Sequence, residues 1–396
     1  MKMLSFASIG NLVFIAIVMF PFDQLFSSLF PQFPISPFRI LTVAIALLVH
    51  RYGTGEFGSY RAFFNLYYIF VVWSFLSFIW SPNVIKSLMY SVQVLLMIWF
   101  SIVSISELIK GKNLIDNIVF YGPIFGGVIA QLGLMGVFSS RELSVDYRLS
   151  FEGIGVNSVS ISIGYMLILG IAFLMAKDNA IIYKILILCC CIVMFYFIIR
   201  TGTRSGVYGV LIATGIAYLF SFKVSAVFVI RFLILSTFFV FTFHYILENY
   251  VGERLVERIF SVQGDDIASN SRNELWNVAF DYFSYNIFGT GAGNEPVAYL
   301  EYGLGPKEAH NVFVSGLLQL GFIGLFILVI AHVMIFFNLF QTKDSISRFT
   351  TLSLFFFLSL QMMKGSFLQT RLFWVPLILI ISLALSERKN SIKTIS

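Results

Sequence analysis

The stretch YKILILCCCIVMFYFIIR, residues 183–200, decides the fold class of this chain. Between Lys184 and Arg200 it carries no charged residue, and it approaches the roughly 20 apolar residues that a helix needs to cross a bilayer. The three cysteines of the chain lie side by side within it, so no pair in separate loops can form a disulfide framework. The stretch therefore predicts a membrane-spanning helix.

The composition of the remaining chain agrees with this prediction. Of 396 residues, 58% are hydrophobic and 12% are charged, and the mean hydropathy is +0.89. Soluble globular chains carry about 25% charged residues. Phenylalanine alone accounts for 46 positions, which suits lipid-facing surfaces and interfacial belts. These values exclude a soluble enzyme, a disordered protein and a coiled coil.

Apolar runs separated by charges and by Gly, Pro and Asn clusters predict about twelve transmembrane helices. They lie near 4–20, 35–50, 62–80, 85–105, 114–136, 156–176, 183–200, 204–221, 225–247, 311–339, 349–367 and 371–386. The first run resembles the apolar core of a signal peptide but lacks a small-residue cleavage site before Asp23, so we expect an uncleaved helix. The prediction is an all-α, polytopic membrane protein, with residues 1–396 forming one integral membrane domain.

The charges predict an orientation for these spans. With an even number of spans and the N-terminus inside, nine lysines lie at inner edges and three at outer edges, so both termini are predicted to be cytoplasmic. The segment 248–309 carries ten acidic and four basic residues, a net charge of −6. We therefore expect 248–310 to be one large outer loop between the ninth and tenth spans. The net charge of +6 comes from basic membrane edges and gives no reason to expect a nucleic acid partner.

Arginine departs from the lysine pattern, because most arginines fall at predicted outer edges. Arg200 and Arg204 stand in the segment IRTGTRSG, and no acid lies between Asp178 and Glu248 to neutralise them. Thr203 is a natural N-cap, which places Arg204 in the first turn of a helix. A cation there makes sense when an anion shares the site, although an interfacial arginine that snorkels to lipid headgroups is the simpler alternative.

A second arginine lies in the acidic loop, in the segment SRNELW that begins at Ser271. Ser271 and Glu274 form a capping-box pattern, so a helix is expected to start there with Arg272 in its first turn. Apolar and polar residues fall on opposite faces, which predicts an amphipathic helix at the membrane surface that stops at the glycine-rich segment 289–293. The alternative is that Arg272 is a solvated charge paired with a neighbouring acid.

A histidine and a third arginine complete the candidate site. His310 precedes Asn311 at the outer start of the tenth span, where the helix dipole favours a neutral imidazole that can act as a general base. Arg148 and Asn157 flank glycines just before the sixth span, and Asn157 is expected to cap that helix. From these residues alone, a hydrogen-bonded interfacial histidine is the more common role. No cluster of His, Cys and Asp has metal-ligand spacing, so no metal site and no cofactor are predicted.

Taken together, these segments resemble the bacterial O-antigen polymerase and O-antigen ligase superfamily. The resemblance rests on RLSF at 148–151 with Asn157, TGTRSG at 201–206, SRNELW followed by GTGAG at 289–293, and AHN at 309–311 followed by GFIGL at 321–325. The four segments occur in the family's order and cover roughly residues 145–340.

The resemblance implies a metal-independent glycosyltransferase of the bacterial inner membrane that acts at the periplasmic face on an oligosaccharide linked to undecaprenyl pyrophosphate. Carried over by position, His310 activates the acceptor hydroxyl, while Arg204 and Arg272 hold the pyrophosphate. Four further residues are substrate-binding candidates: Arg148, Arg200, Asn157 and Asn311. Membrane lipid and a chain-length regulator are the expected partners.

Several functions remain open at this stage. A polymerase would add glycan to a lipid-linked repeat unit, whereas a ligase would transfer the finished glycan to the lipid A core. Both share donor and chemistry, and the diversity of polymerases favours the first. A protein-glycosylating relative, a lipid-glycan transporter or flippase, and a glycosyltransferase with Asp23 as its base are less favoured. A transporter would place ionisable residues near span midplanes, and the predicted spans hold almost none.

Overall fold

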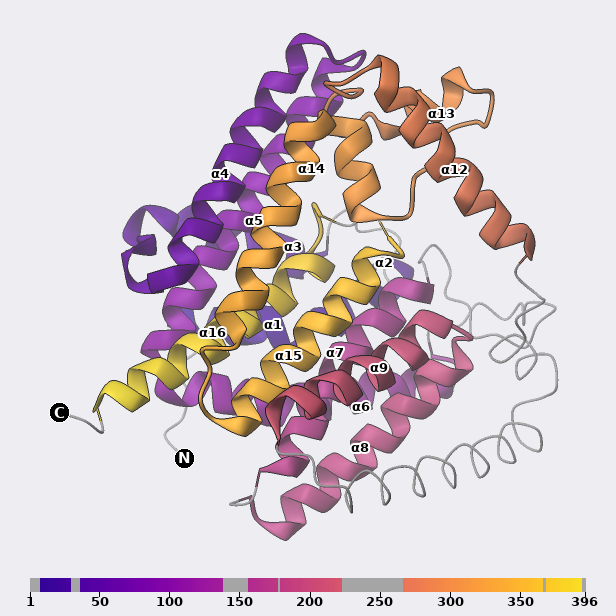
Figure 1. The fold of residues 1–396 in the computed structure, drawn as a ribbon. Helices are drawn as coiled ribbons and strands as arrows, with labels where there is room; N and C mark the ends of the chain where they lie inside the picture. The colour runs from indigo at the N-terminus through magenta and orange to yellow at the C-terminus, as the bar shows by residue number, and fades with distance from the viewer. Residues whose placement is uncertain are drawn as a thin grey trace.

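The computed structural model of the chain describes residues 8–29, 36–137, 156–176, 179–222, 266–365 and 368–393 (Figure 1). All regular secondary structure in these ranges is helical, as the composition predicts. The α-helices are α1 Ile9–Val18, α2 Phe20–Leu29, α3 Pro37–Ala46, α4 Arg61–Leu76, α5 Val84–Lys110, α6 Lys112–Leu134, α7 Val156–Met175, α8 Ile181–Arg200, α9 Arg204–Ser221, α12 Asp266–Tyr285, α13 Glu295–Glu301, α14 Val312–Leu339, α15 Ser345–Met362 and α16 Arg371–Lys393. Three 3-10 helices join them, η1 Leu47–Arg51, η2 Thr54–Tyr60 and η3 Ser77–Ile79.

Each predicted span within the described ranges coincides with helical structure, although the one at 311–339 turns back on itself at Gly321. Six helical segments in these ranges are long and apolar enough to cross a membrane: Thr54–Ile79, Val84–Lys110, Asn113–Leu134, Asn157–Met175, Ile181–Arg200 and Val312–Leu339. The multi-pass membrane character is therefore supported. The total of twelve stays a prediction, because the span near 225–247 lies outside the described residues and helices such as α1 and α3 are short.

Two groups of helices pack into one core. Helices α6, α7 and α8 pack against one another, and α9 lies alongside α15 (Figure 1). Helix α5 contacts α3, α4 and α16, and α4 also contacts α14. Glycines permit α7 and α9 to approach α15 closely, since a Cβ on Gly209 would lie 2.8 Å from Gln361 Nε2, and one on Gly164 would lie 2.5 Å from the Phe357 ring. The α9–α15 contact holds the start of α9 against the end of α15.

Helix α14 is a hairpin of two legs and not one continuous span as expected for 311–339. Its backbone turns at Gly321, with φ +65° and ψ −160°, a region that is essentially restricted to glycine. A Cβ on Gly316 would lie 2.6 Å from Leu328 Cδ1, although twelve residues of straight helix span about 18 Å. The legs 312–320 and 322–339 therefore lie side by side, as Figure 1 shows.

Candidate functional site

The first leg of α14 begins one residue after Asn311, whose side chain caps it. Asn311 Oδ1 accepts hydrogen bonds from the backbone N–H groups of Phe313 at 2.9 Å and Val314 at 3.3 Å. Because Asn311 has an extended backbone and is buried, it satisfies two of the four N–H groups that a helix start leaves free. The predicted start of this helix is confirmed, and the Asn311 amide serves the helix in this structure.

His310 stands just before this cap in an unusual backbone conformation. Its φ is +52°, and it is the one non-glycine residue of the described ranges with a positive φ. The left-handed region costs a side-chain-bearing residue about 1–2 kcal/mol, although histidine is among the residue types that adopt it more often. The imidazole is exposed. Contacts with the neighbouring backbone must hold His310 in this conformation. Two of them are hydrogen bonds to the backbone of Ala309.

Both backbone polar groups of Ala309 are bonded to side chains from other helices. The indole Nε1 of Trp276 in α12 donates to the Ala309 carbonyl at 3.0 Å. The Ala309 N–H donates to Oε1 of Glu295, the first residue of α13. Ala309 is fully buried. The residue directly before His310 is thereby fixed from two sides.

Glu295 also binds the first leg of α14. Its Oε2 accepts from the Ser315 hydroxyl and from Gln319 Nε2 at 3.2 Å. The carboxyl group is buried, and this burial raises its pKa above the ordinary value, with a smaller contribution from the nearby charge of Glu308. The three donors oppose that shift because they favour the charged form. Glu295 therefore joins α13 to Ala309 and to two turns of α14.

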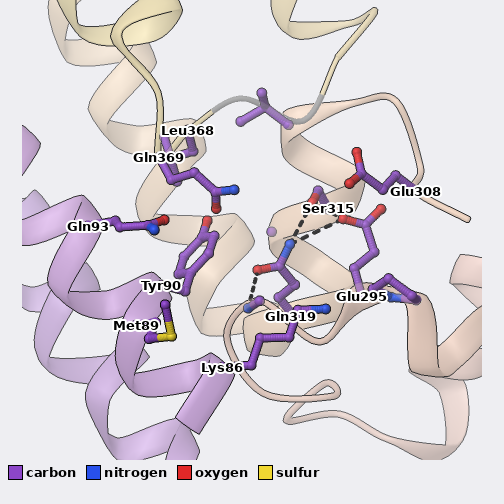
Figure 2. Close-up of a pocket in the computed structure, with 14 residues that line it drawn as sticks. Lys86, Met89, Tyr90, Gln93, Glu295, Glu308, Ser315, Gln319, Leu368 and Gln369 are labelled. Carbon is purple, nitrogen blue, oxygen red and sulfur yellow. Dashed lines mark hydrogen bonds between the residues drawn. The ribbon is translucent and has the colours of Figure 1, made fainter. Parts of the chain in front are cut away.

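Glu295 lines a cavity of about 240 Å³, which Figure 2 shows. Helix α5 supplies Lys86, Tyr90 and Gln93 on one side, and Gln369 lies beside Gln93. Glu308, Val312, Ser315 and Gln319 close the other side. The residues two positions before and after His310 thus face the cavity, whereas His310 itself is not among its lining residues. Carboxyl, amide and hydroxyl groups of this kind bind sugar hydroxyls well.

The glycine-rich segment 289–293 fixes α12 and α13 to the membrane helices. The N–H groups of Thr290 and Gly291 donate to the carbonyls of Leu318 and Gln319, at 2.7 and 2.9 Å. Asn294 Nδ2 contacts Ser81 Oγ at 2.8 Å and Ser87 Oγ at 2.9 Å, at the turn between α4 and α5. A Cβ on Gly291, where φ is +88°, would lie 2.7 Å from Ser81, so only glycine lets the two segments approach this closely. The segment therefore sets the position of Glu295.

The end of α15 connects the start of α14 with the start of α9. Asn311 Nδ2 contacts Met363 Sδ at 3.7 Å, just beyond α15. Gln361 Nε2, two residues earlier, donates to the Ser205 carbonyl at 2.9 Å. Arg204, which precedes Ser205, is the first residue of α9 and is half-buried. The segments that carry Arg204 and His310 therefore meet at one end of the helix bundle.

Helix α12 places Arg272 near the same end of the bundle. It lies one helical turn before Trp276, whose indole binds the Ala309 carbonyl. The apolar face of α12 packs on α13 and on the first leg of α14, through Leu275, Val278, Ala279 and Tyr282. The amphipathic pattern is therefore present, but protein and not lipid covers its described buried face. Phe280 is exposed.

Three details differ from the sequence expectations. Helix α12 starts at Asp266 and not at Ser271, so Arg272 lies beyond its first turn; neither glycine nor proline interrupts 266–270. Asn157 lies inside α7, which begins at Val156, and so is not its N-cap. Thr203 precedes α9 as expected, but its hydroxyl bonds Ser160 Oγ at 2.6 Å and not a helix N–H group.

The remaining predicted residues have separate positions. Arg200 ends α8 and is half-buried, directly before the three-residue turn 201–203 that leads into Arg204. Asn157 is exposed near the start of α7. Arg148 lies outside the described residues. The described contacts therefore bring together the segments of Arg204, Arg272, His310 and Asn311.

Sequence reasoning missed Glu295, which it counted only as one of the loop acids. The signal was its place two residues after the glycine-rich segment and directly before Pro296, a pattern typical of a fixed helix start. It also missed Tyr90, Gln93 and Gln319, whose role depends on the cavity. Asp23, considered as a base, is buried and paired with Arg371 at 3.2 Å.

Comparison with known proteins finds a family match in the central part of the chain. The family model described as O-antigen ligase matches residues 189–329, which include Arg204, Arg272 and His310. The comparison with curated proteins finds no match. The match confirms the resemblance predicted from the sequence and supports the O-antigen ligase and polymerase superfamily for this chain.

Proposed function

We propose that this chain is a surface-polysaccharide polymerase that transfers glycan from undecaprenyl pyrophosphate onto a lipid-linked repeat unit. The reaction takes place at the periplasmic face of the bacterial inner membrane, with both termini in the cytoplasm. His310 acts as general base. Arg204 and Arg272 bind the pyrophosphate of the donor, and Arg148 and Arg200 are auxiliary anion contacts.

The proposed step has a simple balance. The acceptor hydroxyl oxygen attacks the anomeric carbon of the donor glycan, and its proton passes to the His310 imidazole. The bond between that carbon and the pyrophosphate oxygen breaks, and the electron pair leaves with undecaprenyl pyrophosphate. The negative charge on the leaving group grows during this step. Fixed guanidinium groups aimed at this charge lower the barrier, and they supply the role that a metal has in other transferases.

One observation carries the proposal. Side-chain contacts connect the segments of Arg272, His310 and Arg204 through neighbouring residues. Trp276 bonds Ala309 beside His310, Asn311 contacts Met363, and Gln361 bonds Ser205 beside Arg204. Segments more than a hundred residues apart in sequence thus share one end of the bundle. The cavity next to them is lined by hydroxyl, amide and carboxyl groups that suit a sugar acceptor.

An O-antigen ligase is the second candidate, favoured by the description of the matching family. It would use the same donor residues and transfer the finished glycan to the lipid A core. A chain-length regulator is an expected partner only for the polymerase. A transporter would need neither His310 nor paired arginines, so it predicts a different outcome in the same experiment.

The test uses cells that lack the native gene and are complemented with wild type or with His310→Ala, compared at equal expression. Lipopolysaccharide reduced to core plus one repeat unit supports the polymerase. A bare core together with long glycan on undecaprenyl pyrophosphate supports the ligase instead. An unchanged glycan ladder contradicts the mechanism. His50→Ala is the matched control, because His50 is also exposed and lies in η1, away from these contacts.

A further inference from the structure

A second cavity, of about 370 Å³, adjoins the one that Glu295 lines. Gln93 and Gln369 line both cavities, so these two side chains stand at the boundary between them. In Figure 2 they lie side by side, on the opposite side of the first cavity from Glu295 and Glu308. The second cavity contains Arg39 and Arg371. It is therefore basic where the first is acidic.

The Arg371 side chain is buried in the wall of this second cavity and held there by neighbouring residues. Its guanidinium pairs with the Asp23 carboxylate at 3.2 Å and donates to the Ala16 carbonyl, and Ser36 donates to the same carboxylate. The Arg371 side chain is 4% exposed, and its Nε has no hydrogen-bond partner in the described part of the chain. A buried donor without a partner costs about 1–3 kcal/mol. Asp23, the one acid among the residues that line the cavity, is therefore already paired with Arg371 and hydrogen-bonded to Ser36.

Arg39 adds a second positive charge that nothing described neutralises. Its side chain is exposed and forms no hydrogen bond or ion pair with the described residues. It lies close enough to Arg371 for their charges to repel each other. Two guanidinium groups and one carboxylate leave the cavity wall with a net charge of +1. An anion in the cavity would remove this imbalance.

Helix starts strengthen the preference for an anion. Arg39 and Ser158 lie in the first turns of α3 and α7, and Arg371 begins α16. The positive end of the helix dipole makes such ends attractive to phosphate and unfavourable for an isolated cation. Three helix starts with two arginines around one cavity are thus matched to a multiply charged anion.

We propose that this cavity binds the phosphate or pyrophosphate of a second lipid-linked molecule, the acceptor, whose first sugar then occupies the adjoining cavity beside Glu295. The identity of this ligand rests on the proposed function, since a polymerase needs two lipid-linked substrates. Arg39 and Arg371 hold the acceptor, whereas Arg204 and Arg272 hold the donor. The two substrates therefore bind at separate cationic sites.

The test counts bound farnesyl pyrophosphate, a short probe for the lipid-linked headgroup, by native mass spectrometry. The full-length chain is placed in nanodiscs of zwitterionic lipid. Four proteins are compared with wild type: Arg39→Gln, the double variant Arg204→Gln with Arg272→Gln, the control Arg61→Gln, and Arg371→Gln with Asp23→Asn. Arg61 is the matched control because it is exposed and begins α4 without lining either cavity.

We expect two molecules on wild type and on Arg61→Gln, and one on Arg39→Gln, with at least tenfold weaker binding of the second. The Arg371 and Asp23 double variant, which leaves no buried charge unpaired, should also bind one. Arg39→Gln does not disturb the core, since the residue is exposed. Two molecules on Arg39→Gln would overturn the proposal. It would also be overturned if adding phosphatidylglycerol to the nanodisc removed the second molecule, because bulk lipid would then be the occupant.

The same counts separate this inference from the proposed function. If wild type binds only one molecule, and only the Arg204 and Arg272 double variant loses it, the result contradicts the proposed acceptor site. The donor assignment then stands. If the Arg204 and Arg272 double variant still binds two molecules of farnesyl pyrophosphate while Arg39→Gln binds one, the result supports the acceptor site and contradicts the donor assignment.

Discussion

The indole N–H of Trp276 lies 3.0 Å from the carbonyl oxygen of Ala309, which joins α12 to the residue directly before His310. This bond crosses a sequence separation of 33 residues. Since His310 has a positive φ, its position depends on how firmly the adjoining backbone is held. The bond is thus a route by which α12 can influence the proposed catalysis at His310 without touching substrate.

Trp276→Phe should separate this positioning role from packing. A smaller aromatic ring remains, but the hydrogen bond to the buried Ala309 carbonyl is lost, so we expect a stability loss of about 1–3 kcal/mol. Glycan transfer should fall by roughly tenfold, through kcat more than KM, because a displaced base slows the chemical step. Transfer is measured with purified enzyme and a lipid-linked oligosaccharide.

Trp73→Phe is the matched control, since Trp73 Nε1 donates to the Leu320 carbonyl at 2.9 Å, at the far end of the same leg of α14. It loses an equal bond away from His310. If both variants lose activity equally, the Trp276 bond only stabilises the fold.

Glu295 predicts a pH dependence of stability. Burial raises its folded-state pKa, so the protonated form is relatively favoured in the folded chain. The sign follows from linkage: this contribution is fully present below the unfolded pKa and is lost as the pH rises through the raised pKa. Glu295→Gln lacks this titration. We expect the Tm of wild type to fall over that pH window and the Tm of the variant to change less.

The measurement is thermal unfolding of the detergent-solubilised chain across that window. Glu301→Gln is the control, because Glu301 ends the same short helix and is exposed. A Glu295→Gln profile that parallels wild type would show that Glu295 does not titrate between the folded and unfolded states.

Much of this fold follows from hydropathy alone. Long apolar runs such as 183–200 must form helices, because lipid offers no partner for backbone polar groups. The helix start at Arg204 was also predictable from Thr203, although the Thr203 hydroxyl bonds Ser160 and not a helix N–H group. The start of α12 was not, because a capping-box pattern at Ser271 does not stop a helix that can extend to Asp266.

The hairpin of α14 illustrates why other features escaped prediction. Residues 311–339 are apolar throughout, so hydropathy cannot show that the backbone turns at Gly321. That turn depends on the close approach of Ile287 from a distant segment. Glu295 escaped for the same reason, since one acid among ten in the loop gains its role only through Ala309, Ser315 and Gln319.

Gly321→Ala should destabilise the chain strongly. At φ +65°, a Cβ would lie 2.0 Å from the Ile287 carbonyl oxygen, so both backbone strain and a backbone clash result. The strain alone costs on the order of 1–3 kcal/mol. Gly303→Ala measures strain without a clash, since its φ is +73° and nothing lies within 4 Å. A Tm loss no larger than that of Gly303→Ala would contradict the hairpin geometry.

Gln361→Leu tests the connection between α15 and the start of α9. The variant loses the 2.9 Å bond to the Ser205 carbonyl, but it also removes Oε1, which is buried without a partner among the described residues. The two effects offset each other, so we expect a change in unfolding free energy within about 1 kcal/mol.

Activity should respond differently from stability in this variant. Ser205 follows Arg204, so loss of the bond frees the start of α9 and loosens the proposed pyrophosphate contact. We expect a several-fold higher KM for the lipid-linked donor with a smaller change in the KM for the acceptor. Ser353→Ala is the control, because it removes a buried hydroxyl, unpartnered among the described residues, from the same helix. A Gln361→Leu enzyme with an unchanged donor KM would show that α15 does not position Arg204.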